Sequence, residues 1–345
     1  MLQMPFKPRA QILLQLGEQL IKNENIAILE LVKNAYDADA KKVVVNMQSV
    51  NTKETGYIEI RDDGCGMSID IIRDIWMEPG NSHKKEVVER KERSAMGRLP
   101  IGEKGIGRFG VHKLGKVIEL VTKMEGRKEV ALNIDWRIFE QADYLSDVKI
   151  DIREREAEVF KEGKTGTYIR IQKLSTNWTR GMLRNLHRAL TALNSPFESN
   201  QSFKVVLKSN RPEWMEGLIG FKDIKDYALF ECDMKLEKKE LTEFRYNFHP
   251  YNIMQDVKKR SVFFEKPVEM RKREMKNGKK DFTDIDLSRY EIGEIRIKIY
   301  AFDRDTGIMN NFISDKTAFK NYLNENGGIS VFRDGMRILD YGEPD

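Results

Sequence analysis

Cysteine and long apolar runs are both scarce in this sequence. Cys65 and Cys232 are the only cysteines in 345 residues, which excludes a disulfide framework, and four histidines make a structural zinc cluster unexpected. The scarcity of cysteine fits a protein of the reducing cytoplasm. The apolar run at 12–14 is flanked by Gln and Glu, and no stretch reaches the roughly 18 apolar residues of a membrane span. We therefore expect neither a signal peptide nor a membrane partner.

A strong charge of one sign is also lacking. Lys and Arg number 60 against 55 Asp and Glu, and this net charge of +5 does not by itself indicate nucleic-acid binding. The excess is local, because residues 258–280 hold ten basic and three acidic residues. Two interpretations stay open, a solvated loop or a patch that binds nucleic-acid phosphates. The second would use Lys258, Lys259, Arg260, Arg271, Lys272 and Arg273.

The length predicts two domains, and 40% apolar with 33% charged residues is typical of globular chains. Helices are expected at 9–22, 26–37, 68–76, 180–193 and 316–325, with another beginning near Arg108. Strands are expected at 42–48, 57–61, 116–123, 128–135, 147–153, 166–172, 203–208, 227–236, 242–248, 293–302 and 329–339. This order predicts an α+β sandwich over residues 1–198 and a second α+β domain over 199–345.

The second expected helix carries polar residues on one face. Glu30, Asn34 and Asp37 are spaced i, i+4 and i+7, which places them on the same side. Taken alone, this pattern fits the solvated face of an amphipathic helix. An Asn beside a carboxylate also suits magnesium, which takes oxygen ligands, and a Glu one turn away can take a proton from an attacking water.

Three glycine-containing segments follow this helix. Residues 62–67 leave a strand as Asp-Asp-Gly-Cys-Gly-Met, where the glycines permit positive φ and close approach of a ligand. Residues 102–110 carry four glycines just before a helix, whose free N–H groups can bind phosphate oxygens. Residues 165–167, Thr-Gly-Thr, enter a later strand. Each segment by itself is also consistent with a simple turn.

Together and in this order, the four segments resemble the GHKL ATPases, the superfamily of gyrase, the heat-shock chaperone Hsp90, histidine kinases and MutL. Residues 30–38 match its E-x-x-x-N-x-x-D-A box, and 62–66 match D-x-G-x-G. Residues 102–110 match the glycine-rich end of the ATP lid, and Gly166-Thr167 the late G-T pair. The resemblance covers about residues 10–193 and implies the two-layer α/β sandwich of the Bergerat fold.

The resemblance also implies roles for individual residues. Glu30 would be the general base that activates water, and Asn34 would bind Mg²⁺. Asp62 would accept the adenine amino hydrogen, while Thr167 would contact the base through water. The other nucleotide-binding residues would be Asp37, Gly64, Gly66, Met67, Gly102, Lys104, Gly105, Ile106 and Gly107.

Two features favour hydrolysis over phosphotransfer. None of the four histidines lies in a helix before the ATP domain, where histidine kinases carry their phosphoacceptor. Residues 329–339 resemble the strand–turn–strand of the transducer domain in MutL and MORC ATPases. Those transducers offer a basic residue to the γ-phosphate, for which Arg337 and Arg333 are the candidates. Because GHKL hydrolases carry a helical dimerisation region behind the transducer, we expect a longer protein.

The sequence therefore predicts a magnesium-dependent ATP hydrolase. Its lid, about residues 78–104, would close on ATP, and two copies would dimerise through the N-terminal region. The alternative is a nucleotide-sensing binding module with little turnover, which contacts nucleic acid through residues 258–280.

Overall fold

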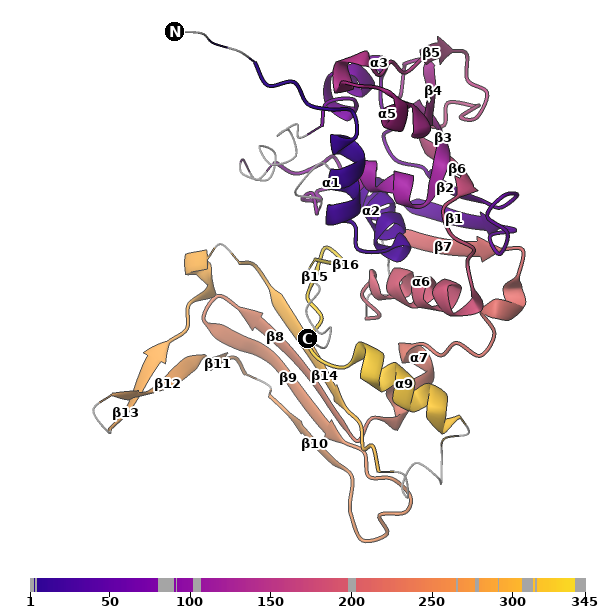
Figure 1. Ribbon diagram of the computed structural model, residues 1–345. Coiled ribbons are helices and arrows are strands. Elements are labelled where there is room, and N and C mark those ends of the chain that lie inside the picture. The colour runs from indigo at the N-terminus through magenta and orange to yellow at the C-terminus, as the bar shows by residue number, and fades with distance from the viewer. Residues whose placement is uncertain are drawn as a thin grey trace. The chain divides into compact units, whose positions relative to one another are not determined.

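The computed structural model describes residues 3, 5–79, 90, 92–101, 107–197, 203–264, 266–276, 279–290, 292–305, 313 and 315–338. The chain forms two compact units (Figure 1). The first comprises Met1–Glu216 and Ile329–Gly342, and the second comprises Gly217–Gly328 with the last three residues. The sequence instead separates the domains at 198/199 and assigns all of 329–339 to the second domain.

The first unit is built on a seven-stranded sheet of order β5-β4-β3-β6-β2-β1-β7. Neighbouring strands run antiparallel except β1 and β7, which are parallel. The strands are β1 (Lys42–Gln48), β2 (Tyr57–Asp62), β3 (Gly115–Lys123), β4 (Glu129–Asp135), β5 (Ile152–Arg155), β6 (Gly166–Leu174) and β7 (Lys204–Ser209). The expected strand at 147–153 therefore lies a few residues later, and the one at 203–208 joins the first sheet rather than the second domain.

Helices α1 (Ile12–Leu20), α2 (Glu24–Asp37) and α6 (Arg180–Ala192) complete the first unit's α/β sandwich. Asn23 caps α2 by accepting a hydrogen bond from the Ile26 N–H at 3.0 Å, as an N-cap side chain does. The core joins apolar residues of these helices to alternate residues of β1, β2 and β3. The expected mixed α+β fold is thus confirmed.

Short elements connect these parts. Ser68 caps α3 (Ile69–Ile71), which continues as the π-helix η1 (Ile72–Trp76) and confirms the helix expected at 68–76. The helix expected near Arg108 is a 3₁₀ helix, η2 (Gly107–Lys113), which packs against α1 and α2. Other short elements of the first unit are α5 (Arg137–Gln141), η3 (Leu145–Asp147) and η4 (Pro212–Trp214).

A buried carboxylate organises the loop between β5 and β6. Glu129 is fully buried and accepts hydrogen bonds from the backbone N–H groups of Glu158, Val159 and Phe160 and from Arg155 Nε. Burial alone would raise the pKa of Glu129, but these four donors hold it below its ordinary value. Glu129 thus anchors the backbone of this loop, and the buried Phe160 ring lies beside Gly166 at the start of β6.

The second unit is a smaller α+β fold. Its main sheet has the order β10-β9-β8-β14, with β11 paired to β9. A small cluster of Ile224, Ile313 and Phe319 forms its core. Its elements are α7 (Phe221–Ile224), η5 (Lys225–Tyr227), β8 (Phe230–Glu237), β9 (Glu240–Phe248), β10 (Arg260–Phe263), β11 (Val268–Glu269), η6 (Leu287–Tyr290), β14 (Ile295–Ala301) and α9 (Lys316–Asn326).

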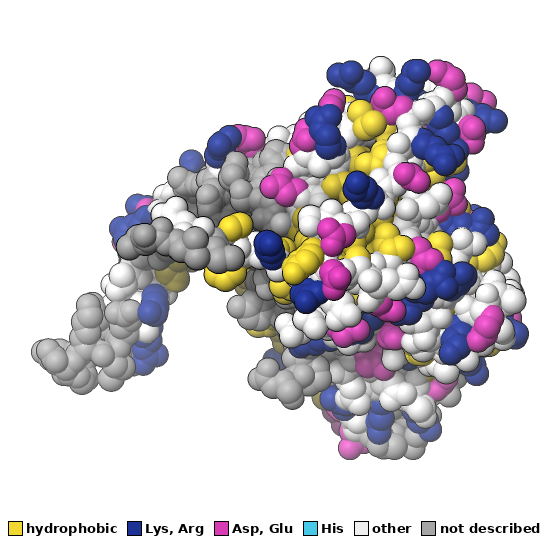
Figure 2. Space-filling view, turned by 45° about the horizontal axis from the view of Figure 1, so that its top comes forward, with side chains coloured by type: hydrophobic (Ala, Val, Ile, Leu, Met, Phe, Trp, Pro, Cys, Tyr) yellow, Lys and Arg dark blue, Asp and Glu magenta, His cyan; other side chains and the backbone are white. Residues whose placement is uncertain are grey.

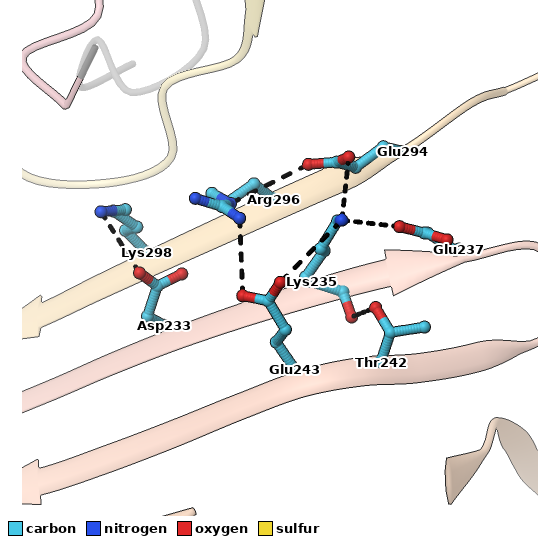
Figure 3. Close-up of polar contacts among 8 residues, drawn as sticks. All are labelled: Asp233, Lys235, Glu237, Thr242, Glu243, Glu294, Arg296 and Lys298. Atoms are coloured by element: carbon cyan, nitrogen blue, oxygen red, sulfur yellow. Dashed lines mark hydrogen bonds and ion pairs between the residues drawn. The ribbon is translucent and has the colours of Figure 1, made fainter. Parts of the chain in front are cut away.

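Opposite charges cross this second sheet from strand to strand (Figure 3). Lys235 Nζ lies 2.7 Å from a Glu237 oxygen and 3.2 Å from a Glu294 oxygen. On the same face of β14, Lys298 pairs with Asp233 at 3.2 Å. Because water still reaches these partly covered pairs, they add little to stability and chiefly fix the register of the strands.

The basic segment 258–280 is not the solvated loop of the first interpretation. It contains β10, β11 and β12 (Arg271–Lys276), and β12 pairs with β13 (Lys279–Asp284) in a separate two-stranded ribbon. The last elements, β15 (Phe332–Arg333) and β16 (Met336–Arg337), form a short hairpin that belongs to the first unit.

Figure 2 shows basic and acidic side chains interspersed on the visible face. Within the described part of the chain, no helix is both long enough and apolar enough to cross a membrane.

Candidate functional site

The polar face of α2 is half-buried. Glu30, Asn34 and Asp37 are each partly covered, whereas the flanking Leu31 and Ala35 are buried in the core. Glu30 Oε1 accepts a hydrogen bond from Lys33 Nζ at 3.0 Å, and about a quarter of each side chain is exposed. A carboxylate and an amide one turn apart therefore lie on a face that is partly shielded from water.

The C-terminal end of α2 contacts the glycine turn that follows β2. The Cys65 N–H donates to the Ala38 carbonyl at 2.8 Å. A Cβ on Gly64 would lie 2.6 Å from that same oxygen, and one on Gly66, whose φ is +66°, would lie 2.0 Å from the Lys123 carbonyl. Only glycine fits either position. The first two sequence motifs thus form one structure.

Asp62 joins this turn to the Gly-Thr pair of β6. Its Oδ1 accepts the backbone N–H groups of Gly64 at 2.9 Å and Thr167 at 3.0 Å. Burial raises the pKa of Asp62 to about 6 and the neighbouring Asp63 adds to the rise, although the two N–H groups oppose it. Both hydrogen bonds use Oδ1, so Oδ2 can serve as an acceptor for a ligand.

Two further threonines complete this end of the site, and no motif indicated one of them, Thr122. Thr122, fully buried on β3, accepts from the Met67 N–H at 2.9 Å and donates to the Gly166 carbonyl at 3.0 Å. Its hydroxyl also lies 3.2 Å from the Thr167 hydroxyl. Thr165 donates to the Gly64 carbonyl at 2.7 Å. A lone Thr within a strand carries no sequence signal, so only the fold identifies it.

The described end of the expected lid, residues 92–101, is attached to the end of α2. We call these residues the lid stem. Asp37 Oδ1 accepts from the Ile101 N–H at 2.8 Å, and Asp39 accepts from Ser94 Oγ at 2.5 Å. Arg98 is 4% exposed, donates to the carbonyls of Tyr36 and Ala40, and lies 4.4 Å from the centre of the Tyr36 ring. Asp37 thus contacts the lid stem directly.

Several predicted residues cannot be placed. Gly102, Lys104, Gly105 and Ile106 lie outside the described residues, as do 80–89 and 91 of the expected lid. Gly107 begins η2, and a Cβ on the following Gly110 would lie 2.2 Å from a side-chain carbon of Ile21. This end of the glycine-rich segment is therefore packed closely against the end of α1.

The two candidate phosphate sensors lie on the β15–β16 hairpin. Arg333 Nη2 donates to the carbonyl oxygens of Pro100 at 3.0 Å and Leu99 at 3.4 Å. The backbone N–H of Arg337 donates to the Leu193 carbonyl at 2.8 Å. The hairpin thus brings Arg333 against the lid stem from the far end of the sequence.

Comparison with known proteins agrees with this geometry. Residues 22–167 match the family described as "Histidine kinase-, DNA gyrase B-, and HSP90-like ATPase". This chain therefore carries a GHKL-type ATPase domain, to which the first four motifs belong.

Two relatives match part of the chain. The ATPase morc-1 of Caenorhabditis elegans is 34% identical over 103 residues, which are 29% of this chain and 10% of that protein. A Herpetosiphon aurantiacus protein described as a type II restriction enzyme, HgiDII, is 32% identical over 111 residues, or 32% of this chain and 16% of that protein. The former supports the MORC-like branch of the superfamily. The matches span only a small part of either relative.

The raised pKa of Asp62 gives a pH-dependent prediction. The carboxylate is ionised above about pH 6, the form that the expected hydrogen bond from the adenine amino group requires, whereas the protonated group presents a competing donor. ATP affinity should therefore fall as the pH drops through 6, by about tenfold per unit well below that pKa.

Calorimetric titration between about pH 5 and 7.5 measures this dependence. Asp62→Asn is the control, because the nucleotide phosphates titrate in the same range in both proteins. Identical pH profiles for the two proteins would contradict the assignment.

Proposed function

We propose that this chain binds ATP with Mg²⁺ and hydrolyses it, and that the bound nucleotide closes the lid and promotes a homodimer. The observation that carries the proposal is the continuity of the site. The half-buried face of α2 bearing Glu30 and Asn34 ends at Ala38, which bonds to the turn beside Asp62. Groups suited to phosphate chemistry and to adenine recognition therefore belong to one structure.

Asp62 and its neighbours suit adenine. An acceptor at Oδ2 matches the exocyclic amine of adenine, whereas guanine presents a carbonyl oxygen at the same place. Gly64 and Gly66 let the turn pack directly against the carbonyls of Ala38 and Lys123, which fixes the turn beside Asp62. Thr167, held by Thr122 and Asp62, offers its hydroxyl to a bridging water.

Glu30 and Asn34 suit hydrolysis. In the proposed reaction the Glu30 carboxylate accepts a proton from a water whose oxygen bonds to the γ-phosphorus. The bond between that phosphorus and the β–γ bridging oxygen breaks, so that ADP and inorganic phosphate form. Lys33, 3.0 Å from Glu30, orients the carboxylate. The amide oxygen of Asn34 has the chemistry of a magnesium ligand, and Mg²⁺ would neutralise phosphate charge there.

We propose that the protein works in the cytoplasm. Cys65 and Cys232 are both free thiols, as a reducing cytoplasm favours. No cluster of three or more His, Cys, Asp or Glu side chains suited to a metal occurs among the described residues.

Replacing the proposed base tests hydrolysis. Glu30→Gln should bind ATP with near wild-type affinity and turn it over about 100-fold more slowly, the scale expected for loss of a general base. Phosphate release and calorimetry measure the two properties separately. Glu18→Gln, an exposed carboxylate on α1, is the matched control. Wild-type turnover in Glu30→Gln would refute the role, and absent turnover in the wild type would favour the sensing module.

Lid closure and dimerisation are tested together. A non-hydrolysable ATP analogue should slow proteolysis within residues 78–104 and shift the protein to a dimer in light scattering, because the γ-phosphate supplies contacts that ADP lacks. ADP should slow this proteolysis and promote the dimer much less. Cleavage within the second unit serves as the internal reference. Equal cleavage and an unchanged mass in all states would exclude the switch.

The ribbon β12–β13 favours a second, compatible function, the binding of double-stranded DNA. Arg271, Lys272 and Arg273 are exposed on β12, and Phe282, 58% exposed, lies opposite Arg273. Lys and Arg side chains gather on the described part of this ribbon (Figure 2). A two-stranded ribbon fits the major groove, and the partial match to a restriction enzyme makes DNA the first nucleic acid to test.

Removing two ribbon charges tests this function. Lys272→Ala with Arg273→Ala should weaken DNA binding and lower the slope of log affinity against log salt by about 2, since each lost phosphate contact removes about 0.9. The control is the double variant Lys128→Ala with Lys164→Ala, which removes the same charge from two exposed lysines of the first unit. Fluorescence anisotropy at several salt concentrations measures both. Equal losses in the two variants would contradict a role for the ribbon.

A further inference from the structure

The β15–β16 hairpin is the first element formed after the chain returns from the second unit. The chain leaves the first unit after Glu216 and re-enters it at Ile329. Asp334 and Gly335, with φ of 51° and 77°, make the tight turn between the two short strands. A segment more than 220 residues away in sequence thereby reaches the lid stem.

The hairpin is fixed to the first unit independently of the lid stem. Its Gly335 carbonyl accepts the Ser195 N–H at 2.9 Å, and its Arg337 N–H donates to the Leu193 carbonyl at 2.8 Å. Met336 is 1% exposed and belongs to the main core. The hairpin is therefore a rigid base from which side chains can act.

Two hairpin residues hold the lid stem near both of its ends. Half-buried Arg333 donates from one nitrogen to the carbonyls of Leu99 and Pro100, and Asp334 lies 3.5 Å from Arg93 Nη1. The carbonyl of Pro100 lies only two residues before the glycine-rich segment that begins at Gly102. A change in the position of Arg333 therefore acts directly on the chain that leads into that segment.

We propose that Arg333 is a positioning residue for nucleotide binding. It fixes the carbonyls of Leu99 and Pro100, and with them the end of the lid stem that Asp37 also holds through Ile101. Arg333 acts through the lid stem and makes no contact with the phosphate. This inference rests on the proposed ATP-dependent function, although the contact to the lid stem can be tested without nucleotide.

Hydrogen exchange without nucleotide tests the contact itself. Arg333→Ala should speed exchange of the amides in residues 92–101, and Arg333→Lys should restore protection only in part, because an ammonium lacks the planar fork of a guanidinium. Arg184→Ala is the matched control, since Arg184 also donates to two carbonyls, those of Trp214 and Glu216. Unchanged exchange in both Arg333 variants would overturn the proposal even if the protein is an ATPase.

Nucleotide affinity tests the consequence. Arg333→Ala should lower the affinity for a non-hydrolysable ATP analogue by about 10-fold, as expected for the loss of a charged hydrogen bond. Its affinity for ADP should stay close to that of the wild type. Equal losses for both nucleotides would overturn a role specific to the terminal phosphate.

A double-mutant cycle with Asp37→Ala separates positioning from direct contact. Asp37 and Arg333 hold adjacent residues of the lid stem, so their effects on analogue affinity should be less than additive. Additive effects would mean that Arg333 contacts the phosphate itself and would overturn the proposal. If the wild type binds no nucleotide, the proposed function fails, and hydrogen exchange still decides whether Arg333 holds the lid stem.

Discussion

The C-terminal end of α2 is the constraint on which the site depends. An α-helix ends with carbonyl groups that have no partner within the helix, and these must be satisfied from outside. Here carbonyls of the last turn accept from backbone N–H groups just beyond the helix, and that of Tyr36 also accepts from the Arg98 guanidinium. The carbonyls of Ala38 and Ala40, which follow the helix, accept from the Cys65 N–H and from Arg98. A cation at this end also opposes the helix dipole. The carbonyls at and just beyond the end of one helix thus join the glycine turn to the lid stem.

The parts of the site that the sequence predicted are those whose chemistry is local. Helical spacing places Glu30 and Asn34 on one face whatever the tertiary contacts, and the glycines at 64 and 66 stand where no Cβ fits. An Asp at the end of a strand before such a turn is recognisable for the same reason. These features follow from short-range geometry, so one sequence is enough to find them.

The parts that the sequence did not predict depend on contacts between distant segments. Thr122 is an ordinary strand residue until β3 and β6 pair, and Arg98 is one of many basic residues in a charged stretch. Strand β7 follows the expected boundary yet pairs in parallel with β1, because the exposed edge of the first sheet is available to it. Periodicity and composition contain no information about such pairings.

The contacts that hold the lid stem differ in how much free energy it costs to break them. Arg98 is buried and bonds to two carbonyls within the core, so breaking its contacts would strand a charge away from water. Arg333 is half-buried, and its bonds of 3.0 and 3.4 Å contribute on the order of 1–3 kcal/mol. A nucleotide can shift the lid stem only by the difference between its affinities for two positions of the stem. A modest difference in affinity therefore acts first on the contact with Arg333, while Arg98 keeps the lid stem attached to α2.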